Sequence, residues 1–389
     1  MRHLILFMLA IELTTAQRVR AQTSKSITPS VSFGTTYDDN LFATVKGDAG
    51  VMTVMRPTLE ADYVSARLNA TSLFSFDVQH SNFPALSTLD ARRRGIVDID
   101  YRTTPAMTLS FGARYDRTET PGELNLDSGI LGPREIADRV EVVPSLSYRT
   151  TTRTTINASY NGMTETEVGY TRGVLHVARG GVTHQVTAHD DFGVSYLGRR
   201  FDDTATHTSN AVLAAWGHDL ASATRVTLQA GPRLSLDKGL AAEVVAGFTR
   251  YTNRARLGLD YWHGETMILG IEGPVAVDSA TAKATWPVSP RSEIGAQTGF
   301  TSSTTLIDQK VRVYNAVARA AWTPRGGNYT FAASYAAEVQ QGLVLRTLFI
   351  PGQVIRHTFR ATVTIAPRSS RTFRPTGELP GDRSQGVSQ

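Results

Sequence analysis

Apolar residues recur at every second position along most of this chain. In the segment 106–117, the odd positions from Met107 to Tyr115 are apolar or aromatic, whereas the even positions from Thr108 to Asp116 are polar, charged or glycine. Successive side chains of a β-strand point to opposite faces of a sheet, so a period of two predicts a strand with one apolar and one polar face. This pattern excludes a helical bundle and restricts the chain to all-β architectures.

Eighteen segments carry this pattern, and an even number is what a single-chain antiparallel barrel requires. The alternation is weakest between residues 165 and 205, where Gly180 and Gly181 interrupt it, so sixteen strands is the alternative count. The expected strands cover residues 27–37, 51–63, 66–80, 92–103, 106–117, 139–149, 153–164, 172–186, 190–201, 208–220, 224–235, 240–251, 254–264, 275–287, 292–303, 310–323, 328–340 and 354–366.

A soluble β-sandwich also alternates, but three features favour a transmembrane antiparallel up-and-down β-barrel. The segments are about ten to thirteen residues long, which suits a tilted membrane crossing better than an ordinary globular strand. Short connections, such as 103–105 and 289–291, alternate with long ones, such as 38–50 and 119–139. Aromatic residues at the ends that meet short turns are typical of an interfacial girdle: Tyr63, Tyr101, Tyr148, Trp286 and Trp322.

Composition agrees with such a barrel. The hydrophobic fraction is 41% and the mean hydropathy is -0.18, which is too polar for a helical membrane protein but ordinary for a wall that is apolar on one face only. Cysteine is absent, which excludes disulfides, thiolate metal sites and a cysteine nucleophile. The net charge is +5, and it gives no case for nucleic-acid binding.

The two ends of the chain differ from the barrel region. Arg2 and His3 precede the apolar run 4–11, and small residues follow at Ala16 and Ala21, so residues 1–21 are expected to be a cleaved signal peptide. No later stretch approaches about twenty apolar residues, so no transmembrane helix is expected. Residues 22–366 form the expected barrel, and 367–389, rich in Arg, Ser, Pro and Gly, form an expected disordered periplasmic tail.

Several short motifs resemble the beta-barrel porin type 2 family. They are the Asp-rich segment 37–42, the segment 120–126, the strand opening 56–59 and the hairpin sequence 145–149. The resemblance is clearest up to residue 165 and covers the mature chain to about residue 366. It implies an outer-membrane barrel, often associated with exopolysaccharide export loci, and it transfers no catalytic residues. The chain departs from many barrels in not ending on an aromatic residue that closes the last strand.

The polar faces supply the candidate pore lining. An arginine or lysine facing lipid at the membrane midplane costs about 2–4 kcal/mol, so charged strand residues are expected to face a hydrated lumen. They could line a solute path, or they could only pair across strands and hold the wall together. Both signs occur, so ion selectivity cannot be inferred. The candidates are Arg56, Glu60, Asp62, Arg67, Asp77, Asp98, Asp100, Arg102, Arg114, Asp116, Glu141, Arg254, Arg256, Asp260, Arg319 and Arg360.

Loops could modify this lumen. The segments 119–139 and 341–353 are the candidates for an inward constriction, although the apolar second one is slightly better explained as an extension of its strands. Asp38, Asp39 and Asn40 carry oxygen ligands suited to Ca²⁺, but the calcium-loop pattern is missing and a solvated turn is the better interpretation. The pair Asp202 and Asp203 has the same status.

An outer-membrane enzyme is the weakest alternative. Barrel hydrolases need a Ser and a His within hydrogen-bond reach. His176, His184, His189, His207, His218 and His263 are available, but none lies in a recognisable motif, and zinc and phosphate-binding motifs are lacking. We therefore expect no enzyme, no cofactor and no metal site.

The sequence thus predicts an outer-membrane channel that passes polar solutes or assists exopolysaccharide export. The alternative is a plugged structural or adhesion barrel with partner-binding outer loops. Expected partners are outer-membrane lipid, the barrel-assembly machinery, and polysaccharide or small polar solutes, with no nucleic acid.

Overall fold

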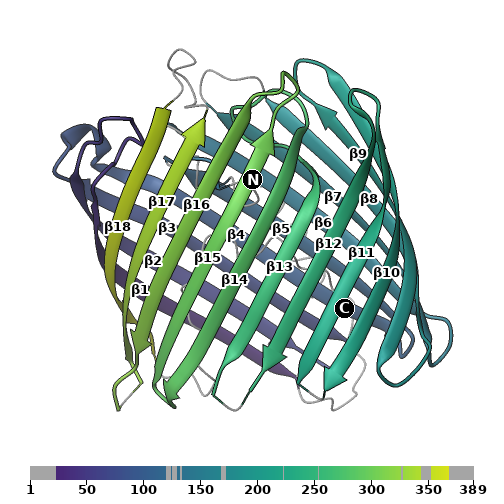
Figure 1. The fold of residues 1–389 in the computed structure, drawn as a ribbon. Helices are drawn as coiled ribbons and strands as arrows, with labels where there is room; N and C mark the ends of the chain where they lie inside the picture. The colour runs from purple at the N-terminus through teal and green to yellow at the C-terminus, as the bar shows by residue number, and fades with distance from the viewer. Residues whose placement is uncertain are drawn as a thin grey trace, which may run out of the picture.

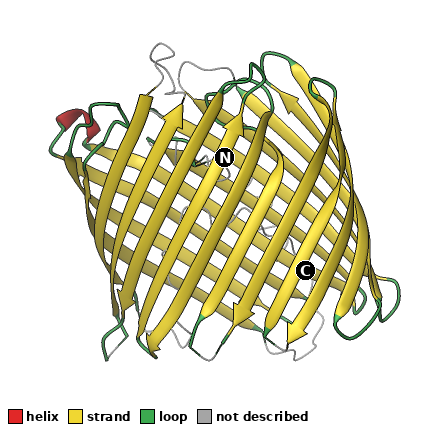
Figure 2. Cartoon of the chain, in the orientation of Figure 1, coloured by secondary structure: helices red, strands yellow, loops and turns green. Residues whose placement is uncertain are grey.

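The computed structural model is a closed antiparallel barrel of eighteen strands (Figure 1). It describes residues 23–119, 124, 129–131, 134–167, 172–221, 223–252, 254–325, 327–342 and 352–367. Each strand pairs with its neighbours in sequence, and β1 pairs with both β2 and β18, which closes the sheet. Eighteen strands are confirmed, and the alternative of sixteen is wrong. One 3-10 turn, Pro84–Leu86, is the only helical element among the described residues (Figure 2).

The strands coincide closely with the segments of alternating polarity. They are β1 Ser24–Asp38, β2 Gly50–Val64, β3 Leu68–Ser81, β4 Thr88–Thr104, β5 Met107–Thr118, β6 Ala137–Arg149, β7 Thr154–Glu167, β8 Gly173–Gln185, β9 Asp190–Asp202, β10 Thr206–Ala221, β11 Thr224–Ser235, β12 Gly239–Tyr251, β13 Arg256–Thr266, β14 Val275–Ser289, β15 Ser292–Thr304, β16 Lys310–Trp322, β17 Tyr329–Gly342 and β18 Gly352–Ile365.

The glycine pair that weakened the sequence pattern lies inside β8. Gly181 faces β9, where a Cβ would come within 2.9 Å of the Cβ of Ser195 and 3.0 Å of the carbonyl oxygen of Val194. Gly180, by contrast, has no neighbour within 4 Å of a Cβ position. A close backbone approach therefore accounts for Gly181 and leaves the strand continuous.

The register separates an inner from an outer face. Arg199 of β9 binds Glu243 of β12, and Arg179 of β8 binds Gln229 of β11, although two strands lie between the members of each pair. Side chains on strands three apart converge only on the concave side of a barrel, so these positions face inward. The positions that alternate with them, such as Val194 and Leu228, are exposed on the convex side.

Aromatic side chains gather on the outer face near the short turns. Tyr101, Tyr148, Trp286 and Trp322 are exposed there, whereas Tyr63 is half-buried with the amine of Lys25 5.5 Å from its ring centre. This is the arrangement of an interfacial aromatic belt, in which amphipathic rings lie at the headgroup level.

Both ends of the barrel chain lie on the short-turn side. Ser24 pairs with Val64 beside the β2–β3 turn, and Ile365 pairs with Tyr329 at the start of β17. The expected signal peptide and residues 368–389 of the expected C-terminal tail lie outside the described residues. Those residues contain no helix that is long and apolar enough to cross a membrane. We call the opposite side, where the long loops lie, the outer mouth.

Candidate transport path

Opposite charges pair between neighbouring strands along one part of the inner wall. Arg56 of β2 contacts Asp77 of β3 at 2.6 Å, and Arg94 of β4 contacts Asp116 of β5 at 2.7 Å. Directly opposite positions in a sheet bring such side chains together, and charge-assisted pairs hold adjacent strands in register. Arg139 of β6 pairs with Glu165 of β7 in the same way. The polar face is thus internally neutralised in this region.

A more deeply buried network lies on the inner face of β9 to β13. Arg199 donates to Glu243 at 2.9 Å, and Arg233 approaches the same carboxylate at 3.3 Å and Glu265 at 3.6 Å. Arg233, Glu243 and Glu265 are only 3%, 1% and 2% exposed. Removing charges from water is costly, so each of these groups depends on its partners for compensation.

The charge pairs continue around the rest of the wall. Arg356 of β18 donates to Asp38 of β1 at 2.6 Å and lies 3.6 Å from Glu338 of β17. Arg319 of β16 donates to Glu293 of β15 at 3.2 Å. The inner surface therefore presents both charge signs on most of its circumference, which suits contact with water and polar solutes rather than lipid.

Fourteen of the sixteen candidate pore-lining residues lie in strands, at positions that share a face with these inward groups. Several have polar partners: Asp62 accepts from Ser26, Asp100 from Ser110, and Glu141 from Asn161. Strand positions on the inward face are Arg56, Glu60, Asp62, Asp77, Asp98, Asp100, Arg102, Arg114, Asp116, Glu141, Arg256, Asp260, Arg319 and Arg360.

The other two candidates, Arg67 and Arg254, lie in short turns rather than in strands. The first hairpin reverses where Ser65 N–H donates to the carbonyl of Leu68 at 2.8 Å. The second reverses where Thr252 N–H donates to the carbonyl of Ala255 at 2.7 Å. Both arginines precede the first paired residue of their strand, so the alternation of that strand does not fix the direction of their side chains.

The sequence interpretation missed the buried network of Arg199, Arg233, Glu243 and Glu265. Arg199 and Glu243 lie at odd positions of their strands, on the face opposite to exposed Val194 and Leu240, so the alternation contained a signal for both. The alternation gives no signal that the two residues meet, because their strands are not neighbours in the sheet.

Loops fold into the outer mouth. The connection between β13 and β14 carries three consecutive apolar side chains, of which Ile268 packs against Val277 and Val313 on the inner wall. Met267 packs in the opposite direction, against Leu175 and Phe201. Leu269 completes the connection, packing against Leu124 and Ala137. We call residues 267–273 the inner tip; the sequence interpretation did not select it.

The described part of the connection between β5 and β6 also lies inside the barrel. Ile130 is fully buried in the same apolar cluster as Ile268. The backbone N–H of Leu131 donates to Oε1 of Gln340 on β17 at 2.7 Å, across the mouth. The first loop candidate thus lies inward where it is described, and residues 343–351 of the second lie outside the described residues. The mouth is narrowed by apolar packing.

The aspartates after β1 form an ordered corner. Asp38 accepts from Arg356 through both carboxylate oxygens, and Asn40 donates from its amide to the carbonyls of Thr44 and Ile355 at 2.7 and 2.9 Å. The described residues hold no group of three acidic or histidine side chains placed for a metal ion. The carboxylate of Asp38 is used for protein contacts, and the expectation of a solvated turn is wrong for Asp38 and Asn40, which are buried.

The second aspartate pair is likewise engaged by the protein. Asp202 accepts from Arg200 at 2.8 Å and from Thr206 at 2.7 Å. Asp203 accepts from the backbone N–H of Gly273, which fastens the inner tip to the β9–β10 connection.

Most of the described histidines contact a threonine, tyrosine or aspartate side chain rather than a serine. His176 contacts the hydroxyl of Tyr160 at 2.5 Å and His263 contacts Asp278 at 2.6 Å. In the described part of the chain, one Ser–His contact occurs, between Ser87 Oγ and His80 Nδ1 at 3.5 Å. Ser87 also bonds the backbone of Ser81, and His80 has no acidic partner among the described residues to orient it, so the contact lacks the third group of a catalytic triad.

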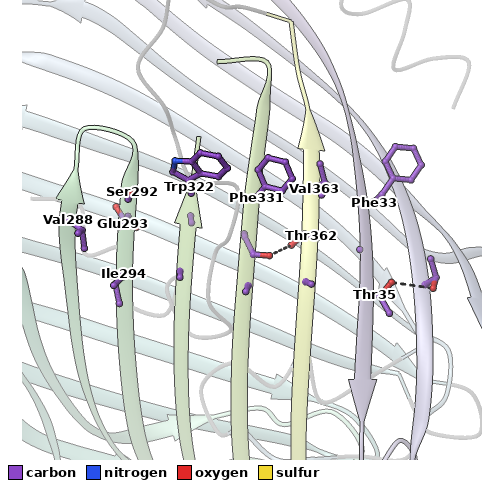
Figure 3. Close-up of a pocket in the computed structure, with 17 residues that line it drawn as sticks. Phe33, Thr35, Val288, Ser292, Glu293, Ile294, Trp322, Phe331, Thr362 and Val363 are labelled. Carbon is purple, nitrogen blue, oxygen red and sulfur yellow. Dashed lines mark hydrogen bonds between the residues drawn. The ribbon is translucent and has the colours of Figure 1, made fainter. Parts of the chain in front are cut away.

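A hollow lies on the outer wall, over β14 to β18 and β1 (Figure 3). Small side chains such as Ala333 and Ala361 are among the residues that line it, and Phe33, Trp322 and Phe331 also lie along it. These aromatic rings are exposed on the convex face. The hollow thus lies on the convex face, and it is not part of the inner path.

No family model matches the chain, and no curated protein matches it. Among solved structures, it is similar to Pseudomonas aeruginosa OccK7 (OpdD), with 11% identity, a TM-score of 0.48, and coverage of 88% of this chain and 99% of that one. It is also similar to Pseudomonas aeruginosa OpdQ, with 11% identity, a TM-score of 0.47, and coverage of 88% of this chain and 99% of that one. A loop-deletion mutant of OmpT, an outer membrane protein of Vibrio cholerae, has 9% identity and a TM-score of 0.42, with coverage of 88% of this chain and 99% of that one.

The wall itself defines the environment of the protein. A closed barrel satisfies every strand edge and is one of only two architectures that cross a bilayer. Its convex face is apolar with an aromatic belt, and its concave face carries the charges. The protein is an antiparallel eighteen-stranded β-barrel of the outer membrane.

Proposed function

We propose that the barrel is a channel for small polar solutes across the outer membrane, narrowed at its outer mouth. The observation that carries the proposal is the inner wall, where cross-strand ion pairs such as Arg56–Asp77 and Arg319–Glu293 follow one another around the circumference. A barrel of this strand number is wide enough to enclose water unless loops fill it. Such a wall would bind a passing solute weakly at many sites, as conduction requires.

A second function is favoured by a specific observation, the apolar packing of the inner tip. Ile268 and Ile130 are 2% and 0% exposed inside the mouth. A barrel closed there would serve as a structural or adhesion protein whose outer loops bind a partner. We place this second because the charged wall continues below the tip.

Two narrower proposals accompany the channel. Assistance to exopolysaccharide export rests on the resemblance to the porin type 2 family alone, and the absence of a matching family model adds no support to it. Outer-membrane lipid and the barrel-assembly machinery are the partners that any barrel of this kind would need. We propose no enzymatic activity, because the described histidines form no triad.

Single-channel conductance of the refolded protein in a planar bilayer tests the channel. Steady steps that are reduced by an added polar solute would support it and would begin to define the solute class. Protein that is demonstrably folded and inserted, by heat-modifiable migration and β-sheet circular dichroism, but that gives no steps would overturn the open channel in favour of the closed barrel.

A further inference from the structure

Two basic residues lie next to each other on the convex face at the outer end of β16. Lys310 and Arg312 are exposed, and they alternate with Val311 and Val313, which are 1% and 3% exposed in contact with the inner tip or beside it. The alternation therefore directs both basic side chains away from the lumen. Two strand residues span about 7 Å, so both long side chains can reach one group held between them. We call Lys310 and Arg312 the cationic pair.

The protein does not neutralise the cationic pair. Neither member has an acidic partner within ion-pair distance among the described residues. Asp308, in the preceding loop, is exposed and makes no ion pair with Lys310. In the row of Arg312, the acid on the convex face is Asp278, which lies two strands away, about 10 Å, and already contacts His263 at 2.6 Å. The pair is thus free to bind an anion from outside the chain.

The pair lies at the outer edge of the apolar band. Trp322 belongs to the aromatic belt beside the short turns, and Arg312 precedes it by ten positions on the same face of β16. Ten strand residues extend about 33 Å, which at a tilt of about 35–45° corresponds to about 25 Å across the membrane, the height of the apolar band. Tyr314, 42% exposed, lies just inside this edge, where interfacial rings are common. The cationic pair is therefore level with the headgroups of the outer leaflet.

An apolar surface continues from the pair towards the middle of the membrane. The ring of Tyr314 packs beside that of Phe300 on β15, with ring centres 5.1 Å apart. Val339 of β17 lies opposite Tyr314, and the exposed residues Ala316 and Ala318 follow on β16. A molecule that lies on this part of the wall meets positive charge at one end and apolar side chains along its length. This surface is complementary to an anionic amphiphile.

We propose that the cationic pair binds a phosphate on the headgroup of an outer-leaflet lipid. The ligand class is a phosphorylated glycolipid whose acyl chains lie along the apolar surface below Tyr314. Arg312 can bind phosphate through two parallel N–H groups, and Lys310 adds a second positive charge. Ser302 and Gln341, on either side of Arg312, offer hydroxyl and amide groups to the sugar. This role goes beyond solute conduction and does not depend on it.

Native mass spectrometry of the refolded full chain, released from micelles of dodecyl maltoside, tests the site. The probes are lipid A with two phosphates, the same lipid after removal of both phosphates, and inorganic phosphate. We expect a single saturable adduct of lipid A, with a dissociation constant at least about tenfold lower than that of the dephosphorylated lipid. Equal affinity for the two lipids would overturn the phosphate site. Inorganic phosphate that binds as tightly as lipid A would overturn the assignment to a lipid.

A charge-matched pair of variants locates the site on the wall. Lys310→Gln with Arg312→Gln removes the cationic pair, and both residues are exposed, so folding should be retained. The control, Arg172→Gln with Arg200→Gln, removes two positive charges beside the outer ends of β8 and β9, where Arg172 donates to Thr164 on the convex face.

We expect the first variant to raise the dissociation constant for lipid A at least about tenfold, and the control to raise it less than about twofold. Heat-modifiable migration checks that both variants are folded. An unchanged dissociation constant in the first variant, or equal increases in the two, would overturn a site at β16. Single-channel conductance should be the same in both variants and in the unmodified protein, because the cationic pair lies outside the lumen.

Discussion

Arg199 on β9 and Glu243 on β12 bind each other at 2.9 Å although β10 and β11 lie between their strands. Arg233 shares the same carboxylate. One glutamate thus balances two buried arginines and links β9, β11 and β12 on the inner wall.

Replacing this carboxylate should therefore weaken the barrel. Glu243→Gln leaves Arg199 and Arg233 without their shared charge, and we expect a loss of about 3–5 kcal/mol in the free energy of unfolding. Urea unfolding of protein in vesicles, followed by tryptophan fluorescence, measures it. Glu60→Gln is the control, because Glu60 lies on the inward face of β2 and is less buried than Glu243. It should change the free energy of unfolding by less than about 0.5 kcal/mol. Equal effects of both changes would contradict the shared role of Glu243.

Opening the inner tip should increase ion flow. Ile268→Ser with Leu269→Ser removes the apolar contacts that hold residues 267–273 against the wall, so we expect a severalfold rise in single-channel conductance. Ile307→Ser, in an exposed loop at the same mouth, is the matched control and should leave conductance unchanged. If the double variant conducts like the unmodified protein, the tip does not limit flow.

The two faces of β5 should respond oppositely to a new arginine. Phe111→Arg places a charge on the convex face, where it costs about 2–4 kcal/mol near the midplane. Ser110→Arg, one position earlier, faces the lumen beside Asp100 and should be nearly neutral. The folded fraction at a fixed urea concentration compares the two. The reverse order would mean that the inner and outer faces are exchanged.

The corner after β1 should be independent of calcium. Asp38→Asn removes the charge that Arg356 contacts, with an expected loss of about 1.5–3 kcal/mol, as for a hydrogen bond to a charged group. Added calcium should change the thermal midpoint of neither protein, because the oxygens of Asp38 are already engaged. A rise in the midpoint with calcium that the Asp38→Asn change removes would restore the metal interpretation.

The wall followed from the sequence because it is built from local information. Each strand reveals its own faces through alternation, as Met107 to Tyr115 do, and each short turn fixes the partner of the next strand. Arg67 and Arg254 lie in turns, where that alternation no longer applies.

The path within the wall could not be derived in this way. The contacts of Arg199 with Glu243, and of Ile130 with Ile268, join residues far apart in the chain, and alternation carries no information about which inward side chains meet. The early end of the ladder between β12 and β13 is similarly hidden, because the strand pattern continues through Gly264 even though pairing with β12 ends at His263.

Closure of the barrel has a consequence for how the protein must be made. Ser32 of β1 bonds Thr364 of β18 across 332 positions of sequence, so the first strand cannot gain its second neighbour until nearly the whole chain has been synthesised. Until then, β1 and the newest strand present open edges that would pair with other chains. The final hairpin, β17–β18, thus acts as the fastener of the wall, and a chain that stops short of it would be a source of aggregation rather than a smaller barrel.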